Sequence, residues 1–246
     1  MKTSNPKSRN HLGIGKNDRV LEVGCGHNPH FRSNVIVDKF IDSNYHRSGD
    51  IKILRDQVFV QADGEALPFK DKEFDYAICN QVLEHVENPI QFVKEQSRVA
   101  KKGYIEVPSL MGEYLFPKKS HKWLILEMDG KLIMMDKKEV NFQSSLDLGE
   151  LFLHHLPSQS IGYKIMQYTH GDVETIRYEW EGEIEILVNP TEEKYRQYFE
   201  KPWTVQDAAT FFPKKSTTSE LWDALKAVGY ILTRSIKAKF GFRAVA

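Results

Sequence analysis

The segment Arg19-Val-Leu-Glu-Val-Gly-Cys-Gly26 combines an apolar run with two glycines at its end. Such a run is typical of a buried strand that stops at a tight turn. Glycine in that turn allows the backbone to approach a ligand closely. Because one Gly-x-Gly pair is weak evidence alone, the surrounding segments decide what it means.

Further short apolar runs follow in the first half, with helical patterns between some of them. The predicted strands are Val35–Val37, Val58–Gln61, Phe74–Cys79 and Tyr104–Val107. Asn88 and Pro89 predict the start of a helix that runs to about Arg98 and buries Ile90 and Val93. This alternation of strands and helices indicates a parallel sheet with crossover connections.

Two features of the sequence limit where helices and strands can form in this half of the chain. Only eight residues, His27–Asn34, separate the glycine turn from the second strand, so any helix there is short, and Pro29 restricts it further. Gly103 is expected to break the chain before the strand that begins at Tyr104.

After Pro108 the pattern changes to hairpins and isolated helices. One hairpin is predicted around Met128-Asp-Gly130 and a second around Glu181-Gly182. The expected helices are Leu146–Leu156, stopped by Pro157, and a segment that Thr217 opens and Gly229 ends. Residues from about 110 to 215 are expected to cover the active edge of the sheet as a lid, with Trp123 and Trp180 influencing the choice of substrate.

Composition narrows the class of protein. Lys plus Arg and Asp plus Glu number 34 each among 246 residues, so no nucleic-acid partner is expected. Cys25 and Cys79 are expected to be small buried residues and not a redox pair. No stretch approaches the ~20 apolar residues of a membrane span, and residues 1–10 lack a signal peptide. We therefore expect a cytoplasmic protein with no membrane partner.

Acidic residues at two strand ends define a candidate ligand site. Asp38 follows the second strand, where a carboxylate can accept hydrogen bonds from both hydroxyls of a ribose. Asp63 follows the third strand, where it can accept from an adenine amino group, and the N–H of Gly64 can donate to a ring nitrogen. Ligands of open parallel sheets bind beyond these carboxyl ends. Together with Gly24 and Gly26, the set predicts a slot for adenosine.

A dinucleotide enzyme is the competing interpretation of this slot. The full Gly-x-Gly-x-x-Gly pattern is absent, because position 29 is proline and no glycine follows before Gly49. A pyrophosphate also needs the N-terminus of a well-formed helix, which the short segment after Gly26 offers poorly. The sequence therefore favours a ligand with one nucleoside.

Residues 19–109 resemble a class I S-adenosylmethionine-dependent methyltransferase of the type 11 kind. The segments that carry the resemblance are Val20-Leu-Glu-Val-Gly-Cys-Gly26, Val35-Ile-Val-Asp38, Ala62-Asp-Gly-Glu-Ala-Leu-Pro-Phe69, Phe74-Asp-Tyr-Ala-Ile-Cys79 and Val82-Leu-Glu-His85. The run Gly103-Tyr-Ile-Glu-Val-Pro-Ser109 resembles a subset often associated with polysaccharide gene clusters. Two departures, Asn28 in place of the third glycine and the truncated first helix, concern the geometry around the methionine tail.

The resemblance implies S-adenosylmethionine as cofactor and assigns further residues to it. Gly24 and Gly26 would contact the methionine part, Glu22 would lie beneath it, and Asn80 would lie near the transferable methyl. The implied fold is α/β, with a Rossmann-like, mainly parallel seven-stranded sheet and an inserted hairpin and helix lid. Residues 1–109 would be the cofactor-binding half, and residues 110–246 the lid insertions and closing strands of the same domain.

Three residues are candidates for a general base. Our first choice is His121, on a loop expected to swing over the cleft, and the second is His85, just past the fourth strand. Glu106 ranks below them, because its side chain is expected to point away from the methyl group. No spacing of His, Asp and Glu indicates a metal site, and His154 and His155 point to different faces of their helix.

The expected function is methyl transfer to a small-molecule or saccharide acceptor, at oxygen. Methyl transfer to nitrogen is one alternative, and a catalytically silent cofactor-binding protein that acts through protein contacts is another. The sequence does not indicate an oligomeric state.

Replacing Asp38 by Ala tests the cofactor assignment. The wild-type chain should bind S-adenosylmethionine or its product at micromolar concentrations, with no comparable binding of NAD. The variant should lose about 1.5–3 kcal/mol of binding free energy for each of two charge-assisted hydrogen bonds. Isothermal titration calorimetry measures both affinities, and an unchanged affinity in Asp38→Ala contradicts the assignment.

Overall fold

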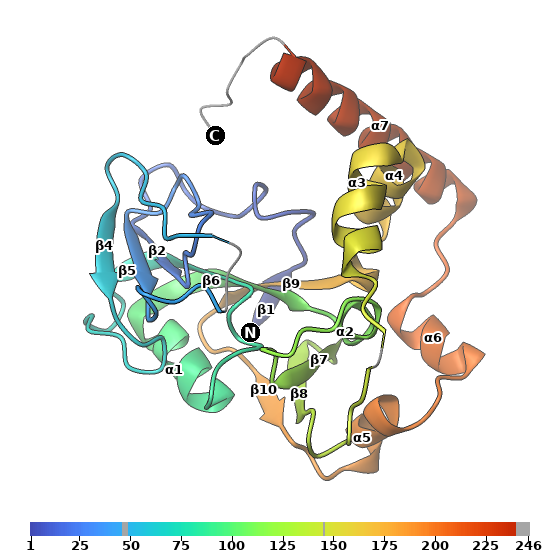
Figure 1. Ribbon diagram of the computed structural model, residues 1–246, viewed down its shortest axis with the longest axis horizontal. Helices are drawn as coiled ribbons and strands as arrows, with labels where there is room; N and C mark the ends of the chain where they lie inside the picture. The colour runs from blue at the N-terminus through green and yellow to red at the C-terminus, as the bar shows by residue number, and fades with distance from the viewer. Residues whose placement is uncertain (46–48, 145, 240–246) are drawn as a thin grey trace.

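The computed structural model describes residues 1–45, 49–144 and 146–239 (Figure 1). One sheet contains seven strands in the spatial order β1-β9-β6-β5-β2-β3-β4. Their bounds are β1 (Lys2–Ser4), β2 (Val20–Val23), β3 (Val35–Asp38), β4 (Val58–Gln61), β5 (Phe74–Asn80), β6 (Ala100–Pro108) and β9 (Thr175–Glu181). The four strands predicted up to residue 79 all form, within one or two residues of the expected bounds.

The sheet is mainly parallel, as predicted. The five strands from β4 to β6 run parallel, β9 pairs antiparallel with β6, and β1 pairs antiparallel with β9. From β2 the chain proceeds to β3 and β4 on one side, then returns to β5 and β6 on the other. The strand order therefore reverses between β2 and β5, which is where open α/β sheets bind ligands.

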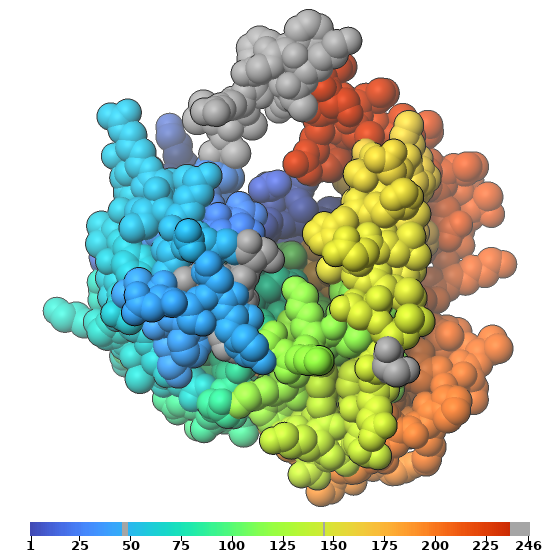
Figure 2. Space-filling view, in the orientation of Figure 1, coloured from blue at the N-terminus to red at the C-terminus, as the bar shows by residue number. Residues whose placement is uncertain are grey.

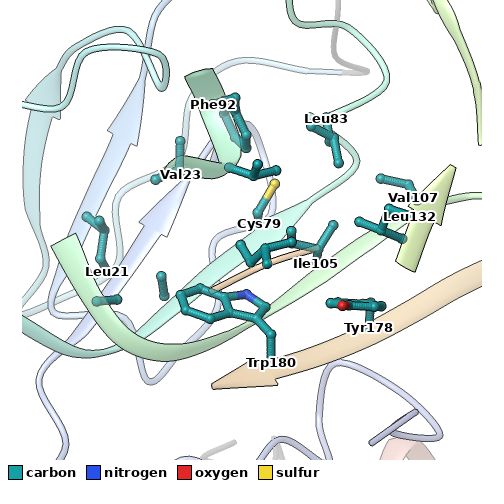
Figure 3. Close-up of a cluster of buried hydrophobic side chains, with 14 of the residues drawn as sticks. Leu21, Val23, Cys79, Leu83, Phe92, Ile105, Val107, Leu132, Tyr178 and Trp180 are labelled. Atoms are coloured by element: carbon teal, nitrogen blue, oxygen red, sulfur yellow. The ribbon is translucent and has the colours of Figure 1, made fainter. Parts of the chain in front are cut away.

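The centre of the sheet is buried on both faces. Leu21, Cys79, Ile105 and Trp180 come from four different strands and pack in one hydrophobic cluster (Figure 3). Cys25 is also a free, buried thiol, as expected for a small filler. Trp180 is 1% exposed and its ring belongs to this core, so it offers no open surface to a substrate.

Gly103 does not break the chain but lies inside β6. A Cβ atom at this position would lie 2.3 Å from the carbonyl oxygen of Ala77 and 2.7 Å from the ring of Trp180. The glycine is needed because the neighbouring strand and an indole ring approach so closely, and not because the strand ends there.

The segment after β2 contains no helix at all between residues 24 and 34. It is held instead by the buried carboxylate of Glu22, which accepts hydrogen bonds from the N–H of His30 (2.6 Å) and the hydroxyl of Ser33 (2.8 Å). A side chain thus replaces helical hydrogen bonding in a connection too short for a helix.

Helix α1 (Pro89–Val99) begins as predicted, because the Asn88 side chain accepts from the N–H of Gln91. Its buried face was predicted only in part. Val93 is buried as expected, but Ile90 is 44% exposed. Phe92, on the opposite face of the helix from Ile90, is buried and packs in the core cluster of the large sheet.

A second sheet of three strands holds the predicted first hairpin. Strands β7 (Trp123–Met128) and β8 (Lys131–Asp136) pair across a turn in which Asp129 and Gly130 have φ values of 54° and 74°. Positive φ at both turn residues is the geometry that favours a two-residue hairpin. Trp123 is 7% exposed and its indole N–H donates to the carbonyl of Val86, so it too is a core residue with little open surface.

The prediction of a second hairpin is wrong. Strand β9 pairs with β6 and β1 in the large sheet, whereas β10 (Ile186–Val188) pairs parallel with β8 in the small sheet. The alternation of apolar and polar residues was correct for β9, but its partner is set by burial of Ile176, Tyr178 and Trp180 against β6 and not by proximity in sequence.

Helices and single turns make up the rest of the second half. They are α2 (Leu110–Leu115), the π-helical turn η1 (Glu150–His155), α3 (Leu156–Gln159), α4 (Ile161–Thr169), η2 (Gly171–Val173), α5 (Glu193–Glu200), α6 (Val205–Phe211) and α7 (Thr217–Lys239). Figure 2 shows a hollow between the N-terminal half, in blue and cyan, and helices α3 and α4, in yellow. Among the described residues, no helix combines the length and apolarity needed to cross a membrane.

Two helix ends differ from the prediction. Pro157 does not stop a helix but lies in the first turn of α3, where its missing N–H costs nothing. Gly229 does not end α7, which continues to Lys239. Among the described residues nothing lies within 4 Å of a Cβ built at Gly229, so that glycine is neither a cap nor a point of close packing.

A charged clamp ties α1 to the segment that follows β4. Both oxygens of Glu95 accept from Arg98 at 2.7 Å, and Glu95 also accepts from the N–H of Leu67. Arg98 donates in turn to the carbonyls of Leu67 and Phe69. The hydrogen bonds from Arg98 hold the pKa of Glu95 below its ordinary value, although burial opposes ionisation.

Glu95→Gln should lower the free energy of unfolding by about 1.5–3 kcal/mol at pH 7, because it removes a charge-assisted pair. The folded-state pKa lies below the unfolded value of about 4.3, so this contribution is complete above that pH. It is lost as the pH falls through the lowered pKa. Urea unfolding followed by circular dichroism at pH 7 and pH 3 should show a gap that narrows in acid.

The matched control is Glu193→Gln, which removes an exposed partner of Lys201. An exposed pair of this kind contributes little to stability, because water and salt screen it. A loss in Glu95→Gln no larger than in this control, or a gap independent of pH, contradicts the stabilising role of the clamp.

Candidate functional site

A pocket of about 180 Å³ lies at the carboxyl ends of β2, β3 and β4, beside the point where the strand order reverses. Five of the seven predicted cofactor-binding residues line it, namely Gly24, Gly26, Asp38, Asp63 and Gly64. The other two, Glu22 and Asn80, are not among its lining residues. The loop after β5 contributes His85 to the opposite wall, and Lys122 reaches the rim from the second half of the chain.

The glycine turn after β2 bends the backbone into the pocket wall. Gly24 has a φ of 74°, and its N–H donates to the carbonyl of Val37 at 2.7 Å. A Cβ atom at Gly24 would lie 2.1 Å from the side chain of Val82, so any larger residue would collide with the loop after β5. The turn therefore requires glycine for its conformation and for space.

Backbone N–H groups from two segments of the pocket wall orient the carboxylate of Asp38. One carboxylate oxygen accepts from the N–H of Gly26 and the other from the N–H of Phe40, both at 3.1 Å. The first of these bonds connects the end of β3 to the glycine turn after β2. The two strand ends thus act as one unit, with a carboxylate at its centre.

Asp63 lies on the same wall and pairs with a lysine. It accepts from Lys39 at 2.6 Å and from the N–H of Glu65 at 3.0 Å. Burial opposes ionisation, but the bonds from Lys39 and Glu65 outweigh it and lower the pKa of Asp63. The carboxylate is therefore an acceptor at neutral pH, as its expected contact with an amino group requires.

Gly64 allows an aromatic ring to form the floor of the pocket. A Cβ atom at this position would lie 2.4 Å from the ring of Phe92 and 3.1 Å from Val23. Phe92 comes from α1, so the floor depends on how that helix packs. The walls are otherwise largely apolar, which suits a flat ring between two carboxylates.

Glu22 lies beneath the glycine turn and is 1% exposed. Burial raises the pKa of Glu22, although the nearby Arg9 guanidinium at 3.5 Å and the bonds from His30 and Ser33 oppose the shift. Its hydrogen bonds from His30 and Ser33 show that Glu22 organises the turn, and its predicted place beneath the methionine part of the cofactor stays a prediction.

Arg9 is a residue of this region that the sequence analysis missed. Its guanidinium donates to the carbonyl of Asn28 at 2.9 Å and faces Glu22. In the amide orientation that satisfies both neighbours, Asn80 accepts from Arg9 at 3.3 Å and donates to Glu106 at 3.2 Å. A single arginine in a polar N-terminal segment carries no sequence signal for this role, because only the fold brings it to the turn.

Glu106 is a paired carboxylate and not a group aimed at the pocket. It accepts from the hydroxyl of Tyr104 and forms an ion pair with Arg177 at 3.4 Å. With Asn80 it forms a polar chain that leads from Arg9 to Arg177 across the ends of β5 and β6. This supports its low rank among the candidate bases.

The two predicted catalytic histidines lie together but in different environments. His85 lines the pocket, and its Nδ1 lies 3.0 Å from the carbonyl oxygen of Ser120. His121 is 5% exposed and does not line this pocket, and its Nδ1 lies 2.6 Å from Glu113. The two rings meet edge to face, with centroids 4.7 Å apart.

The expectation that His121 sits on a surface loop that swings over the cleft is therefore wrong. Lys122 continues directly into β7, and Glu113 binds both His121 and Lys137. Burial opposes ionisation of Glu113, but these two partners lower its pKa. His121 is anchored from two sides, which a sequence reading of the loop could not reveal.

Comparison with known proteins shows what residues 21–105 are similar to. Residues 21–105 match the family model described as a methyltransferase domain, which confirms the resemblance found in the sequence. An uncharacterized methyltransferase of Mycobacterium leprae is 39% identical over 64 residues, which cover 26% of this chain and 24% of that protein. A fatty-acid O-methyltransferase of Mycolicibacterium smegmatis is 31% identical over 137 residues, 51% of this chain and 47% of that protein.

An uncharacterized protein of Methanocaldococcus jannaschii is 55% identical over 42 residues, which cover 17% of this chain and 20% of that protein. The chain therefore spans between about a fifth and a half of the length of these curated relatives. Among solved structures, an S-adenosylmethionine-dependent methyltransferase of Mesorhizobium loti is 10% identical and aligns over 70% of this chain and 95% of that one, with a TM-score of 0.36. At that score the likeness carries no weight, and the assignment of the family depends on the match of residues 21–105.

Proposed function

We propose, from the premise that residues 21–105 are a methyltransferase domain, that this protein transfers a methyl group from S-adenosylmethionine to a small-molecule or saccharide acceptor. S-adenosylmethionine is the cofactor of such a domain, as predicted from the sequence. The observation that carries the proposal is the pocket where the strand order reverses, lined by the glycine turn and by two strand-end carboxylates.

The chemistry of the pocket fits this cofactor. Asp38 offers a carboxylate for ribose hydroxyls, and Asp63 one for an adenine amino group. Phe92 provides an apolar floor beneath Gly64 for the adenine ring, and no pyrophosphate site is needed. Gly24 and Gly26 line the same pocket, and we propose that the methionine part of the cofactor lies against them.

The sulfonium of the cofactor supplies an activated methyl group, so the protein contributes mainly by positioning. Holding the two reactants in line can supply roughly 7–11 kcal/mol of the barrier reduction. Oxygen is the acceptor atom that we propose, and one relative matched over about half of each chain is named as an O-methyltransferase. Nitrogen remains the alternative acceptor, and residues 110–246 are proposed to determine which acceptor binds.

Arg9 is proposed to recognise the carboxylate of the methionine tail. It lies beside the turn that follows Gly26, is 17% exposed, and contacts both Asn28 and Asn80. Glu22 on its other side is buried and available to balance its charge. A guanidinium in such a position suits a carboxylate, because its donors match two oxygens at once.

Arg9→Gln should weaken binding of S-adenosylhomocysteine by about 10-fold or more, since a charge-assisted hydrogen bond contributes about 1.5–3 kcal/mol. The affinity for 5′-deoxy-5′-methylthioadenosine, which lacks the amino-acid tail, should stay within about 2-fold. Calorimetry on both ligands gives the comparison. The control is Arg32→Gln, which changes an arginine that donates to the carbonyls of Gly15 and Lys16. Equal losses for the two ligands would show that Arg9 acts on the fold of the turn.

Of the two predicted catalytic histidines, His85 is proposed to face the acceptor. It lines the pocket with the cofactor residues, whereas His121 touches it only through the ring of His85. His121 is thus proposed to act as a positioning residue. An imidazole has an ordinary pKa close to neutrality, which suits contact with a hydroxyl that loses its proton.

Turnover is tested by release of S-adenosylhomocysteine from wild-type protein incubated with saccharides, hydroxylated small molecules, fatty acids and amines. His85→Ala should lower kcat by about 10²-fold or more on a hydroxyl acceptor, with an unchanged cofactor Kd. His121→Ala should have a smaller effect on kcat, and the exposed His154→Ala is the control. If the cofactor binds but no acceptor yields product, the catalytically silent alternative is favoured.

A further inference from the structure

Three side chains with metal-binding atoms converge beside the pocket. Glu84, His85 and His121 each place one ligand atom within 4.8 Å of the others. Glu84 and His85 follow β5, and His121 comes from the segment just before β7. The sequence analysis predicted no metal site, because no spacing links residues 84 and 85 to a histidine 36 positions away.

The carboxylate of Glu84 is buried and has no hydrogen-bond partner among the described residues. Its residue is 0% exposed, and neither oxygen makes a hydrogen bond to any part of the chain that the structure describes. His121 Nε2 lies 3.9 Å from Glu84 Oε1, which is too far for a hydrogen bond. Burying a carboxylate without partners is costly, so such a group indicates a ligand that completes it.

Both histidines have the outer partners that metal-binding histidines use. His121 Nδ1 lies 2.6 Å from Glu113 and His85 Nδ1 lies 3.0 Å from the Ser120 carbonyl. A histidine that binds a metal usually donates its other ring N–H to a carboxylate or a backbone carbonyl. With Nδ1 of His121 donating to Glu113, its Nε2 is the atom turned toward Glu84.

We propose that Glu84, His85 and His121 bind one divalent transition-metal ion of the zinc class. Two imidazole nitrogens and one carboxylate oxygen are the donors preferred by Zn²⁺ and Co²⁺, whereas Mg²⁺ and Ca²⁺ prefer oxygen alone. Bonds of about 2.0–2.2 Å span at most about 4.4 Å across an ion. The 3.9 Å between His121 and Glu84 falls inside this span. All three ligand atoms lie within 4.8 Å of one another, so no separation has to close by more than a few tenths of an ångström.

The competing interpretation is a buried, protonated Glu84 with no ion. In that case Glu84 would be an isolated carboxyl group, and its replacement by glutamine would leave metal affinity unchanged. The outer partners Glu113 and Ser120 would then serve only to hold the two rings.

The site borders the cofactor pocket through His85. Three protein ligands leave one position of a tetrahedral ion open, as in catalytic zinc sites. An acceptor hydroxyl that occupied this position would be polarised by the ion, and His85 would serve as a ligand instead of contacting the hydroxyl itself. This use depends on the proposed function, whereas binding of the ion does not.

The test uses the full chain after treatment with a chelator. Co²⁺ titration followed by visible absorption should show one ion per chain with the intense bands of a four- or five-coordinate site, and calorimetry should give the Zn²⁺ affinity. Glu84→Gln and His121→Ala should each weaken Zn²⁺ by at least about 100-fold, since even outer partners contribute 10–100-fold. Glu113→Gln should weaken it by about 10–100-fold while S-adenosylhomocysteine affinity stays constant.

The matched control replaces His154 and His155, an exposed histidine pair on η1. Loss of binding in this control, equal affinity in Glu84→Gln, or no stoichiometric Co²⁺ spectrum in the wild type would overturn the proposal. If a variant fails to fold, the wild-type spectrum still decides. Metal binding without turnover on any acceptor would contradict the proposed function alone, and turnover in a chain that binds no Co²⁺ would overturn the metal site alone.

Discussion

The buried carboxylate of Glu22 connects three parts of the chain on which the pocket depends. It accepts from the backbone of His30 and the hydroxyl of Ser33, and it faces the guanidinium of Arg9. The connection from β2 to β3 is too short for a helix, so these contacts replace helical hydrogen bonds. They fix the direction in which the chain leaves Gly24, and thereby the wall against which Asp38 is set.

The edge of the large sheet explains how Arg9 reaches that position. Strand β1 pairs with β9, a strand almost 180 residues later, and the chain then returns to enter β2 at the centre of the sheet. The second half therefore contributes a strand to the large sheet itself, because β9 supplies the partner that anchors the N-terminal segment. Figure 1 shows β1 and β9 side by side in this arrangement.

The parallel strands and the strand-end acids were predictable from the sequence, because continuous apolar runs and the residues that end them are local signals. The partner of β9, the continuation through Gly103 and the passage of α7 through Gly229 depend on neighbours far away in sequence. The same is true of the site: Asp38 and Asp63 were found from their strand ends, whereas Arg9 and the group around Glu84 have no local pattern. The burial of His121 also escaped prediction, because Glu113 lies on a different element.

Helix α1 has a second role that follows from the contact between Phe92 and Gly64. The same helix is fastened through Glu95 and Arg98 to the segment that begins at Asp63. A ligand that rests on the Phe92 ring is therefore in thermodynamic linkage with the packing of the helix below it. Because of this linkage, a ligand in the pocket also stabilises α1 against local opening. Slower amide hydrogen exchange in α1 would therefore indicate that the pocket is occupied.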